Sequence, residues 1–218
     1  MTLLDNIPPG LILILGAIVL LLLPATARKA GAIALAALGF YAIFQLNVGE
    51  RLSPSFLGYD LKLLRVDATS KAFGYIFTLC AVAAFIFSWH EKRRAENTAA
   101  LVYIGSALGV VFAGDMITLF IFWELMVVTS VFLILARRTE RARAAAMRYL
   151  LIQVLSGVIL LSGVLIRAYE TGSIAFDFIG WSGLSSSLIL LAFGIKAAFP
   201  LLHNWLTDAY PEATPTGT

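Results

Sequence analysis

Two ionisable residues lie far inside apolar stretches of this sequence, where a charge is costly. Glu124 is nine residues into an apolar run that begins near Asp115, and Lys196 is twelve residues into a run that begins near Leu184. At a rise of about 1.5 Å per residue, these positions are roughly 13 Å and roughly 18 Å along their helices. An ionisable residue at the centre of a bilayer costs about 2.5–3.5 kcal/mol on insertion scales, and such residues usually mark ion pathways. We therefore expect Glu124 and Lys196 to form an opposite-charge pair that handles ions.

A static ion pair that locks the two helices together is the alternative interpretation. Membrane helix interfaces use small residues and weak hydrogen bonds more often than full charges, which favours the transport interpretation. Uncharged polar residues nearby could line a water path, or could hydrogen-bond between helices, which is the commoner role. These residues are Thr129, Ser130, Gln153, Ser156 and Ser162.

A proline follows the buried lysine by four residues. Pro200 has no N–H, so the carbonyl of Lys196 loses its helical hydrogen bond, and the helix, which also contains Gly194, is expected to kink or break there. The freed carbonyls would face a cation or a water-filled cavity, or a neighbouring Ser or Thr would satisfy them in a simple kink. His203 shares the face of Lys196 if the helix continues. It could then relay a proton, or it could make a polar contact at the inner surface.

The other acidic candidates stand at predicted helix ends. Asp115 follows Gly114 and is expected to cap a helix N-terminus, with a proton site as the second interpretation. Asp208 is a further secondary candidate. The single cysteine, Cys80, excludes an intrachain disulfide and is expected to be a small packing residue. The sequence has no metal-spaced His/Cys cluster, phosphate-binding glycine loop or nucleophile elbow, so we expect no metal, no cofactor and no catalytic site within the chain.

The composition indicates the elements that hold these residues. The chain has 218 residues, of which 60% are hydrophobic and 13% charged, and the mean hydropathy is +0.90. Soluble domains have about 45–50% apolar and about 25% charged residues. This excludes a disordered chain, a disulfide scaffold and an ordinary soluble enzyme, and the net charge of +3 gives no sign of nucleic-acid binding. We expect an all-α polytopic protein embedded in a lipid bilayer.

About seven transmembrane helices are predicted, because a span needs roughly 20 mostly apolar residues. The runs are 7–25, 30–47, 68–89, 99–112, 115–136, 144–166 and 184–199. Ten of the sixteen Lys and Arg residues follow the first, third and fifth runs, and five follow the second and sixth. This places the N-terminus outside, with the first run retained as a helix. The alternation around Asp60 and Lys62 predicts a short outer-surface hairpin after the second helix.

Three stretches resemble motifs of a known family. They are residues 114–126 (Gly-Asp-Met-Ile-Thr-Leu-Phe-Ile-Phe-Trp-Glu-Leu-Met), residues 196–209 (Lys-Ala-Ala-Phe-Pro-Leu-Leu-His-Asn-Trp-Leu-Thr-Asp-Ala) and, more weakly, residues 148–150 (Arg-Tyr-Leu). They resemble helices 5, 7 and 6 of the antiporter-like subunits shared by respiratory complex I and Mrp-type multisubunit cation/proton antiporters. The Gly-Asp pair and the run Tyr-Pro-Glu-Ala-Thr at 210–214 look closest to the D-type member of the Mrp antiporters.

The resemblance implies roles for particular residues. Glu124 and Lys196 match the proton-handling pair, His203 matches the family histidine, and helix 7 is interrupted near Lys196 and Pro200. The chain departs from the family at Thr207, where proline is usual, and at Tyr210, where histidine is common. Family members resemble fourteen-helix proteins with two inverted five-helix repeats, so the chain corresponds to the N-terminal half. Residues 1–97 would form helices 1–3 with the hairpin, and residues 98–218 a partial repeat that lacks helix 8.

The resemblance also implies a function. We expect a proton-translocating subunit of a multisubunit antiporter that exchanges H⁺ for Na⁺ or another monovalent cation, in a bacterial inner membrane. Its partners would be other hydrophobic subunits. The alternatives are a proton-pumping subunit of a redox-driven complex, of the complex I or membrane hydrogenase type, and an assembly module that moves no ion. The chain is not expected to be an enzyme by itself, although it could belong to a redox enzyme complex.

Overall fold

The computed structural model of the chain describes residues 7–56, 58–90, 94–176, 178–181 and 183–217. The long helices are α1 (Pro9–Leu21), α2 (Ala25–Gln45), α3 (Ala68–Phe87), α4 (Arg94–Phe112), α5 (Met116–Leu135), α6 (Glu140–Thr171) and α7 (Gly183–Lys196). The short ones are α8 (Asn204–Ala209) and the 3-10 helices η2 (Ser88–His90) and η3 (Tyr210–Glu212). Within these residues, five helices, α2 to α6, are long and apolar enough to cross a membrane, and α1 and α7 are shorter apolar helices. The protein is therefore mostly helical and suited to a membrane.

The long helices follow the predicted apolar runs, but several helix ends differ. α4 begins at Arg94 rather than at residue 99, and α6 extends from Glu140 to Thr171 rather than over 144–166. Charged residues continue both helices beyond their apolar parts, which hydropathy alone does not detect. Local signals set the ends of α6. The Thr139 side chain accepts a hydrogen bond from the backbone N–H of Ala142, and Gly172 ends the helix in the left-handed conformation, with φ of 68°.

The segment between α2 and α3 contains four short strands. β1 (Gly49–Arg51) pairs antiparallel with β4 (Leu64–Val66), and β2 (Ser55–Phe56) pairs antiparallel with β3 (Tyr59–Asp60). This segment is joined to the turn before α5. The backbone N–H of Lys62 donates to Asp115 Oδ2 at 2.7 Å, and the backbone N–H of Gly114 donates to the Lys62 carbonyl at 2.8 Å. The link between β3 and β4, through Lys62, thereby holds the start of the helix that carries Glu124.

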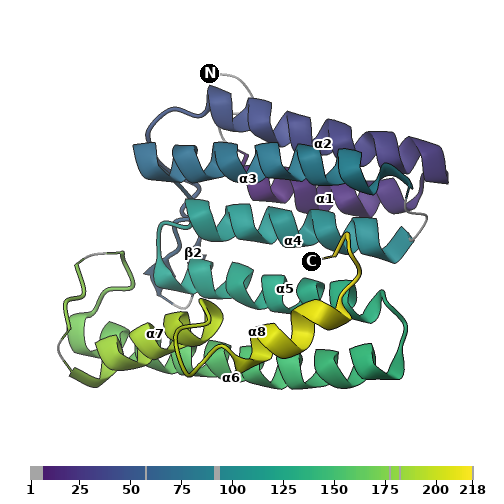
Figure 1. Cartoon of the computed structure of the whole chain (residues 1–218). Helices are drawn as coiled ribbons and strands as arrows, with labels where there is room; N and C mark the ends of the chain where they lie inside the picture. The colour runs from purple at the N-terminus through teal and green to yellow at the C-terminus, as the bar shows by residue number, and fades with distance from the viewer. Residues whose placement is uncertain (1–6, 57, 91–93, 177, 182, 218) are drawn as a thin grey trace.

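The long helices form three neighbouring groups, and α1 lies between the α2–α3 pair and α4 (Figure 1). Figure 1 shows α1, α2 and α3 on one side, α4 and α5 in the middle, and α6, α7 and α8 on the other side. α1 and α4 approach closely at a pair of glycines, because a Cβ at Gly10 would lie 2.3 Å from the carbonyl oxygen of Gly105. Such small-residue contacts let membrane helices pack backbone to backbone.

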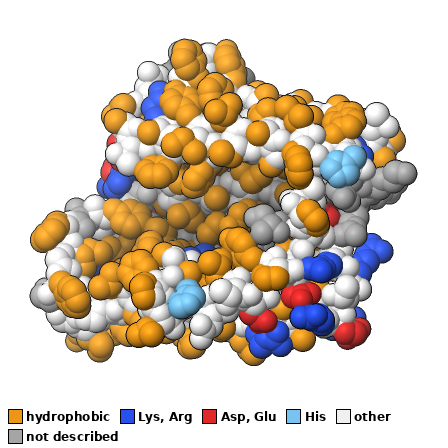
Figure 2. Space-filling view, viewed as in Figure 1, with side chains coloured by type: hydrophobic (Ala, Val, Ile, Leu, Met, Phe, Trp, Pro, Cys, Tyr) orange, Lys and Arg blue, Asp and Glu red, His pale blue; other side chains and the backbone are white. Residues whose placement is uncertain are grey.

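The molecular surface has the character expected of a protein in lipid. Figure 2 shows hydrophobic side chains over most of one face, with charged side chains gathered near the end of the bundle where α5 leads into α6. Cys80 is exposed on α3, so the expectation that it packs inside the protein is wrong. An apolar stretch in a membrane protein has a lipid-facing side as well as a packed side, and composition does not distinguish the two.

α7 ends at Lys196 with a regular helix-terminating motif. The backbone N–H of Phe199 donates to the Gly194 carbonyl at 2.9 Å, and that of Ala198 donates to the Ile195 carbonyl at 3.2 Å. Ala198 is left-handed, with φ of 55°. This pattern of bonds is the Schellman motif, which usually has glycine at the left-handed position. Residues 197–203 are not helical, and α8 begins at Asn204.

Candidate functional site

Glu124 lies in the middle of α5 and its carboxylate rests against the backbone of α6. A Cβ added at Gly157 would lie 1.8 Å from Glu124 Oε1. The carboxylate therefore occupies the space that any side chain at position 157 would fill. Sequence reasoning missed Gly157, because a contact between two helices leaves no mark in the spacing along either one.

Lys196, the last residue of α7, lies over the aromatic ring of Trp123 on α5. Its Nζ atom is 4.7 Å from the ring centroid, a distance at which the electrons of the ring attract an ammonium ion. The ring also makes an edge-to-face contact with Phe193, with 5.0 Å between centroids. Trp123 directly precedes Glu124 in the chain, so one helical turn of α5 presents both the aromatic ring and the carboxylate.

The two ionisable groups lie in the same region without bonding to each other. In the part of the chain that the structure describes, neither Lys196 Nζ nor Glu124 Oε1 has a hydrogen-bond partner, although both atoms are buried. The groups are still close enough for their opposite charges to attract each other. Buried polar groups are normally satisfied by protein or by water, and sites that depart from this are often functional.

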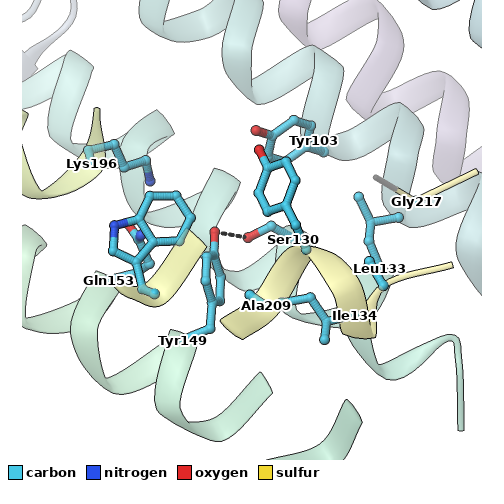
Figure 3. Close-up of a pocket in the computed structure, with 12 residues that line it drawn as sticks. Tyr103, Ser130, Leu133, Ile134, Tyr149, Gln153, Lys196, Ala209 and Gly217 are labelled. Atoms are coloured by element: carbon cyan, nitrogen blue, oxygen red, sulfur yellow. Dashed lines mark hydrogen bonds between the residues drawn. The ribbon is translucent and has the colours of Figure 1, made fainter. Parts of the chain in front are cut away.

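A cavity of about 180 Å³ lies beside the lysine. Its lining includes Lys196, Gln153, Tyr149, Ser130 and Tyr103. Figure 3 shows these side chains together, with a hydrogen bond between the hydroxyls of Tyr149 and Ser130, which are 2.7 Å apart. The cavity therefore has a polar wall formed by α4, α5, α6 and the end of α7.

The structure separates the uncharged polar candidates into two groups. Ser156 donates to the Ala192 carbonyl of α7 at 2.9 Å, and so it joins two helices. Thr129 and Ser162 donate to carbonyls of their own helices, those of Leu125 and Val158. Gln153 and Ser130 are the candidates that line the cavity. Tyr149 and Tyr103 complete its polar wall. Tyr149 belongs to the weak motif at residues 148–150 but was given no role from the sequence, and Tyr103 was not noted at all.

The secondary acidic candidates have structural partners. Asp115 caps α5 by accepting hydrogen bonds from the backbone N–H and the hydroxyl of Thr118, at 2.8 and 2.6 Å, which confirms the cap. Asp208 on α8 accepts two hydrogen bonds from Arg148, from Nε at 2.7 Å and from Nη2 at 2.8 Å. Paired bonds of this kind fix the orientation of both groups, and they tie α8 to α6.

The remaining candidates lie around the end of α7. Gly194 is buried and supplies a carbonyl to the terminating motif, and Pro200 is exposed just beyond it. His203 is exposed at the start of α8 and is not on a continuous helix with Lys196. Trp205 holds α8 against the end of α7, because its indole N–H donates to the Ile195 carbonyl at 2.8 Å. The structure therefore brings Glu124, Lys196 and Gln153 together and leaves His203 at the surface.

The chain resembles several known membrane proteins. Residues 113–218 match the family model described as NADH:quinone oxidoreductase/Mrp antiporter, TM. Hydrogenase-4 component B of Escherichia coli is 29% identical over 78% of this chain, and NAD(P)H-quinone oxidoreductase chain 4 1 of a Picosynechococcus species is 30% identical over 69% of it. The chain spans 28% and 30% of the length of these two relatives.

Solved structures share the fold. A chain of the archaeal membrane-bound sulfane sulfur reductase superposes with a TM-score of 0.84 and 25% identity, over 97% of this chain and 37% of that one. A chain of the Mrp complex from a Dietzia species superposes with a TM-score of 0.77 and 21% identity, over 100% of this chain and 45% of that one. From the family match, the relatives and the fold, the chain belongs to the antiporter-like subunit family shared by NADH:quinone oxidoreductases and Mrp antiporters.

Proposed function

We propose that the chain is a proton-translocating membrane subunit in which Lys196 carries the proton and Glu124 controls when it is released. The observation that carries this proposal is the environment of Lys196. Its Nζ atom is buried, has no hydrogen-bond partner within the described residues, and lies on a polar cavity near the Glu124 carboxylate. If the pair were only structural, we would expect the ammonium and the carboxylate to hydrogen-bond directly, because a buried charge without a partner destabilises the fold.

The mechanism uses the attraction between the two charges. A carboxylate near an ammonium group stabilises its protonated form, so Lys196 holds its proton while Glu124 is near. When Glu124 moves away, or a second cation approaches, the ammonium form becomes less favourable and the proton passes on. Moving one charge across the membrane is worth about 2.3 kcal/mol per 100 mV, so net transport must be coupled to an ion gradient or to a redox partner.

Exchange of protons for Na⁺ or another monovalent cation is the first candidate for that coupling. It is supported by the Gly-Asp and Tyr-Pro-Glu-Ala-Thr motifs, which resemble those of the D-type member of the Mrp antiporters, and by the fold shared with a chain of an Mrp complex. In this proposal the chain works with other hydrophobic subunits in a bacterial inner membrane, with its N-terminus and the strands between α2 and α3 on the outer side. The chain then consists of two parts, an N-terminal part of three helices with the hairpin (1–97) and a partial antiporter-like repeat (98–218). In this repeat, α7 and α8 together correspond to one interrupted helix.

Proton pumping driven by electron transfer is the second candidate. It is favoured by the two relatives whose names are those of redox complex subunits, hydrogenase-4 component B and NAD(P)H-quinone oxidoreductase chain 4. In this case the electrons would pass through other chains. Na⁺-dependent proton movement by the purified complex would select the antiporter, whereas iron–sulfur or flavin absorbance in the same complex would select the redox-driven pump.

Substitution of Glu124 separates transport from assembly. We expect Glu124→Gln to leave the complex assembled and to lower its proton flux, measured with a pH-sensitive dye inside liposomes that contain the purified complex. Glu140→Gln is the matched control, since Glu140 is exposed at the start of α6. If the chain is instead an assembly module, Glu124→Gln reduces the yield of the complex, and the complex that forms moves no protons even with the native glutamate.

A further inference from the structure

Gln153 has a buried amide that the protein does not satisfy. Its side chain is fully buried in α6, and neither Oε1 nor Nε2 has a hydrogen-bond partner among the described residues. Leaving such a group unpaired costs on the order of 1–3 kcal/mol, and buried polar groups are normally satisfied by protein or by ordered water. The amide therefore needs a partner that can enter the protein.

The cavity next to Gln153 has the size and the polarity to hold that partner. At the roughly 30 Å³ that a water molecule occupies in the liquid, its volume of about 180 Å³ has room for about six waters. A bound water needs two to four polar partners. The Gln153 amide, the ammonium group of Lys196 and the hydroxyls of Tyr149 and Tyr103 line this space.

The polar groups follow one another through the cavity. In Figure 3, Lys196 and Gln153 lie on one side, the bonded pair Tyr149 and Ser130 lies in the middle, and Tyr103 lies beyond it. Either hydroxyl can donate in the middle bond, and while the Ser130 hydroxyl uses its single hydrogen to donate to the Val127 carbonyl at 2.8 Å, Ser130 accepts from Tyr149. The Tyr149 oxygen is then left to accept a hydrogen bond from the cavity.

We propose that Gln153 is a positioning residue that anchors a chain of bound water between Lys196 and the Tyr149–Ser130 pair, and that this chain carries protons to and from the lysine. The amide can donate to one water and accept from another, which orients both. When the ammonium gives up its proton, the first water accepts it and passes one of its own protons to the next, and the last water of the chain releases one proton to solvent at the open side of the cavity. Each water gains one proton and loses one, and Lys196 is left neutral. This inference rests on the proposed proton transfer at Lys196 and names its route.

Substitution of Gln153 tests the route. Gln153→Leu keeps a similar volume and removes both polar atoms, so proton flux through the assembled complex in liposomes should fall by about tenfold or more. Gln153→Asn keeps the amide and should retain most of the flux. The matched control is Ser162→Ala, because Ser162 lies on the same helix but bonds only within it. Gln153→Leu at wild-type flux overturns the inference. If Lys196→Met abolishes flux in the same assay, the proposed function still holds.

A measurement on the unaltered complex covers the case in which Gln153→Leu fails to assemble. Brief X-ray irradiation in ¹⁸O-labelled water generates hydroxyl radicals from waters inside a protein, and these radicals mark the side chains beside them. Tyr149 should incorporate the label, whereas Phe112, which is 1% exposed in the apolar cluster between α1, α2 and α4, should not. If Tyr149 incorporates no more label than the unlabelled reference Phe112, the cavity is dry and the inference is overturned, whatever the transport activity.

Discussion

Gly157 decides where the Glu124 carboxylate can lie. Because a Cβ there would stand 1.8 Å from Glu124 Oε1, Gly157→Ala must push the carboxylate away from its place. We predict that this substitution lowers proton flux by about tenfold, the effect of about 1.4 kcal/mol on a rate. The measurement is flux through the assembled complex in liposomes.

A second substitution supplies the control for that prediction. Glu124→Asp shortens the side chain by one methylene group, so the double variant Gly157→Ala with Glu124→Asp should recover flux relative to Gly157→Ala alone. If alanine at position 157 leaves flux unchanged, the contact does not position the carboxylate.

The sequence indicated the ionisable residues of the site but not their surroundings. Glu124 and Lys196 stand out because a charge inside an apolar run is costly wherever the neighbouring helices lie. Gly157 and Tyr103 are unremarkable in sequence, since a small residue and an aromatic residue are common in any membrane helix, and the weak motif that contains Tyr149 gives it no role. Their roles arise only from the packing of α4 to α7.

The end of α7 is held in a conformation that suits glycine better than alanine. Ala198 has φ of 55°, and a left-handed residue with a side chain costs roughly 1–2 kcal/mol. We predict that Ala198→Gly stabilises the protein by about 1 kcal/mol, observed as a higher midpoint of thermal unfolding in detergent. The adjacent Ala197→Gly is the control and should stabilise nothing, because Ala197 precedes the left-handed residue. A lower midpoint for Ala198→Gly would contradict this account of the helix end.

The start of α3 is sensitive to pH. The Asp67 carboxylate accepts a hydrogen bond from the backbone N–H of Ser70 at 2.7 Å, and this bond lowers the pKa of Asp67 in the folded protein. The stabilisation is therefore complete above the unfolded pKa of about 3.9 and is lost as the pH falls through the lower folded value.

Asp67→Ala should cost about 0.5–2 kcal/mol of unfolding free energy at neutral pH, the usual effect of losing a helix cap. The difference from the unaltered protein should shrink below about pH 4, measured by denaturant unfolding across the pH range. Asp60→Ala is the control, because Asp60 is an exposed residue of β3 that caps no helix, and it should leave the unfolding free energy at neutral pH nearly unchanged. A difference that stays constant into acid would mean that the carboxylate charge plays no part in the cap.

Helix ends were the elements that the sequence located least well. The apolar runs predicted where the long helices lie, because burial in lipid requires them. Arg94 and Glu140 begin α4 and α6 outside the predicted runs, since a helix can continue into water with charged residues. The Asp115 cap was predictable, because a Gly-Asp pair before an apolar run is a local signal that needs no tertiary contact.

At the scale of the whole molecule, the distribution of Lys and Arg predicts how the bundle lies in the membrane. In a Cys80→Ser background, we expect Asp60→Cys to react with a membrane-impermeant maleimide added outside the cell. Arg141→Cys, which lies near the start of α6, should react only after the membrane is opened. Both positions are exposed, so each can react in opened membranes, which is the control. The reverse pattern would contradict the orientation.

Proton flux through a Lys196 variant tests the central claim most directly. The assembled complex is reconstituted in liposomes, and Lys196→Met is compared with Lys71→Met, a lysine of α3 whose ammonium donates to the Leu46 carbonyl at 2.8 Å, away from the cavity. We predict that Lys196→Met abolishes proton movement while the complex still assembles, and that Lys71→Met retains it. An assembled Lys196→Met complex that moves protons at the rate of the unaltered complex would contradict the assignment of Lys196 as the proton carrier.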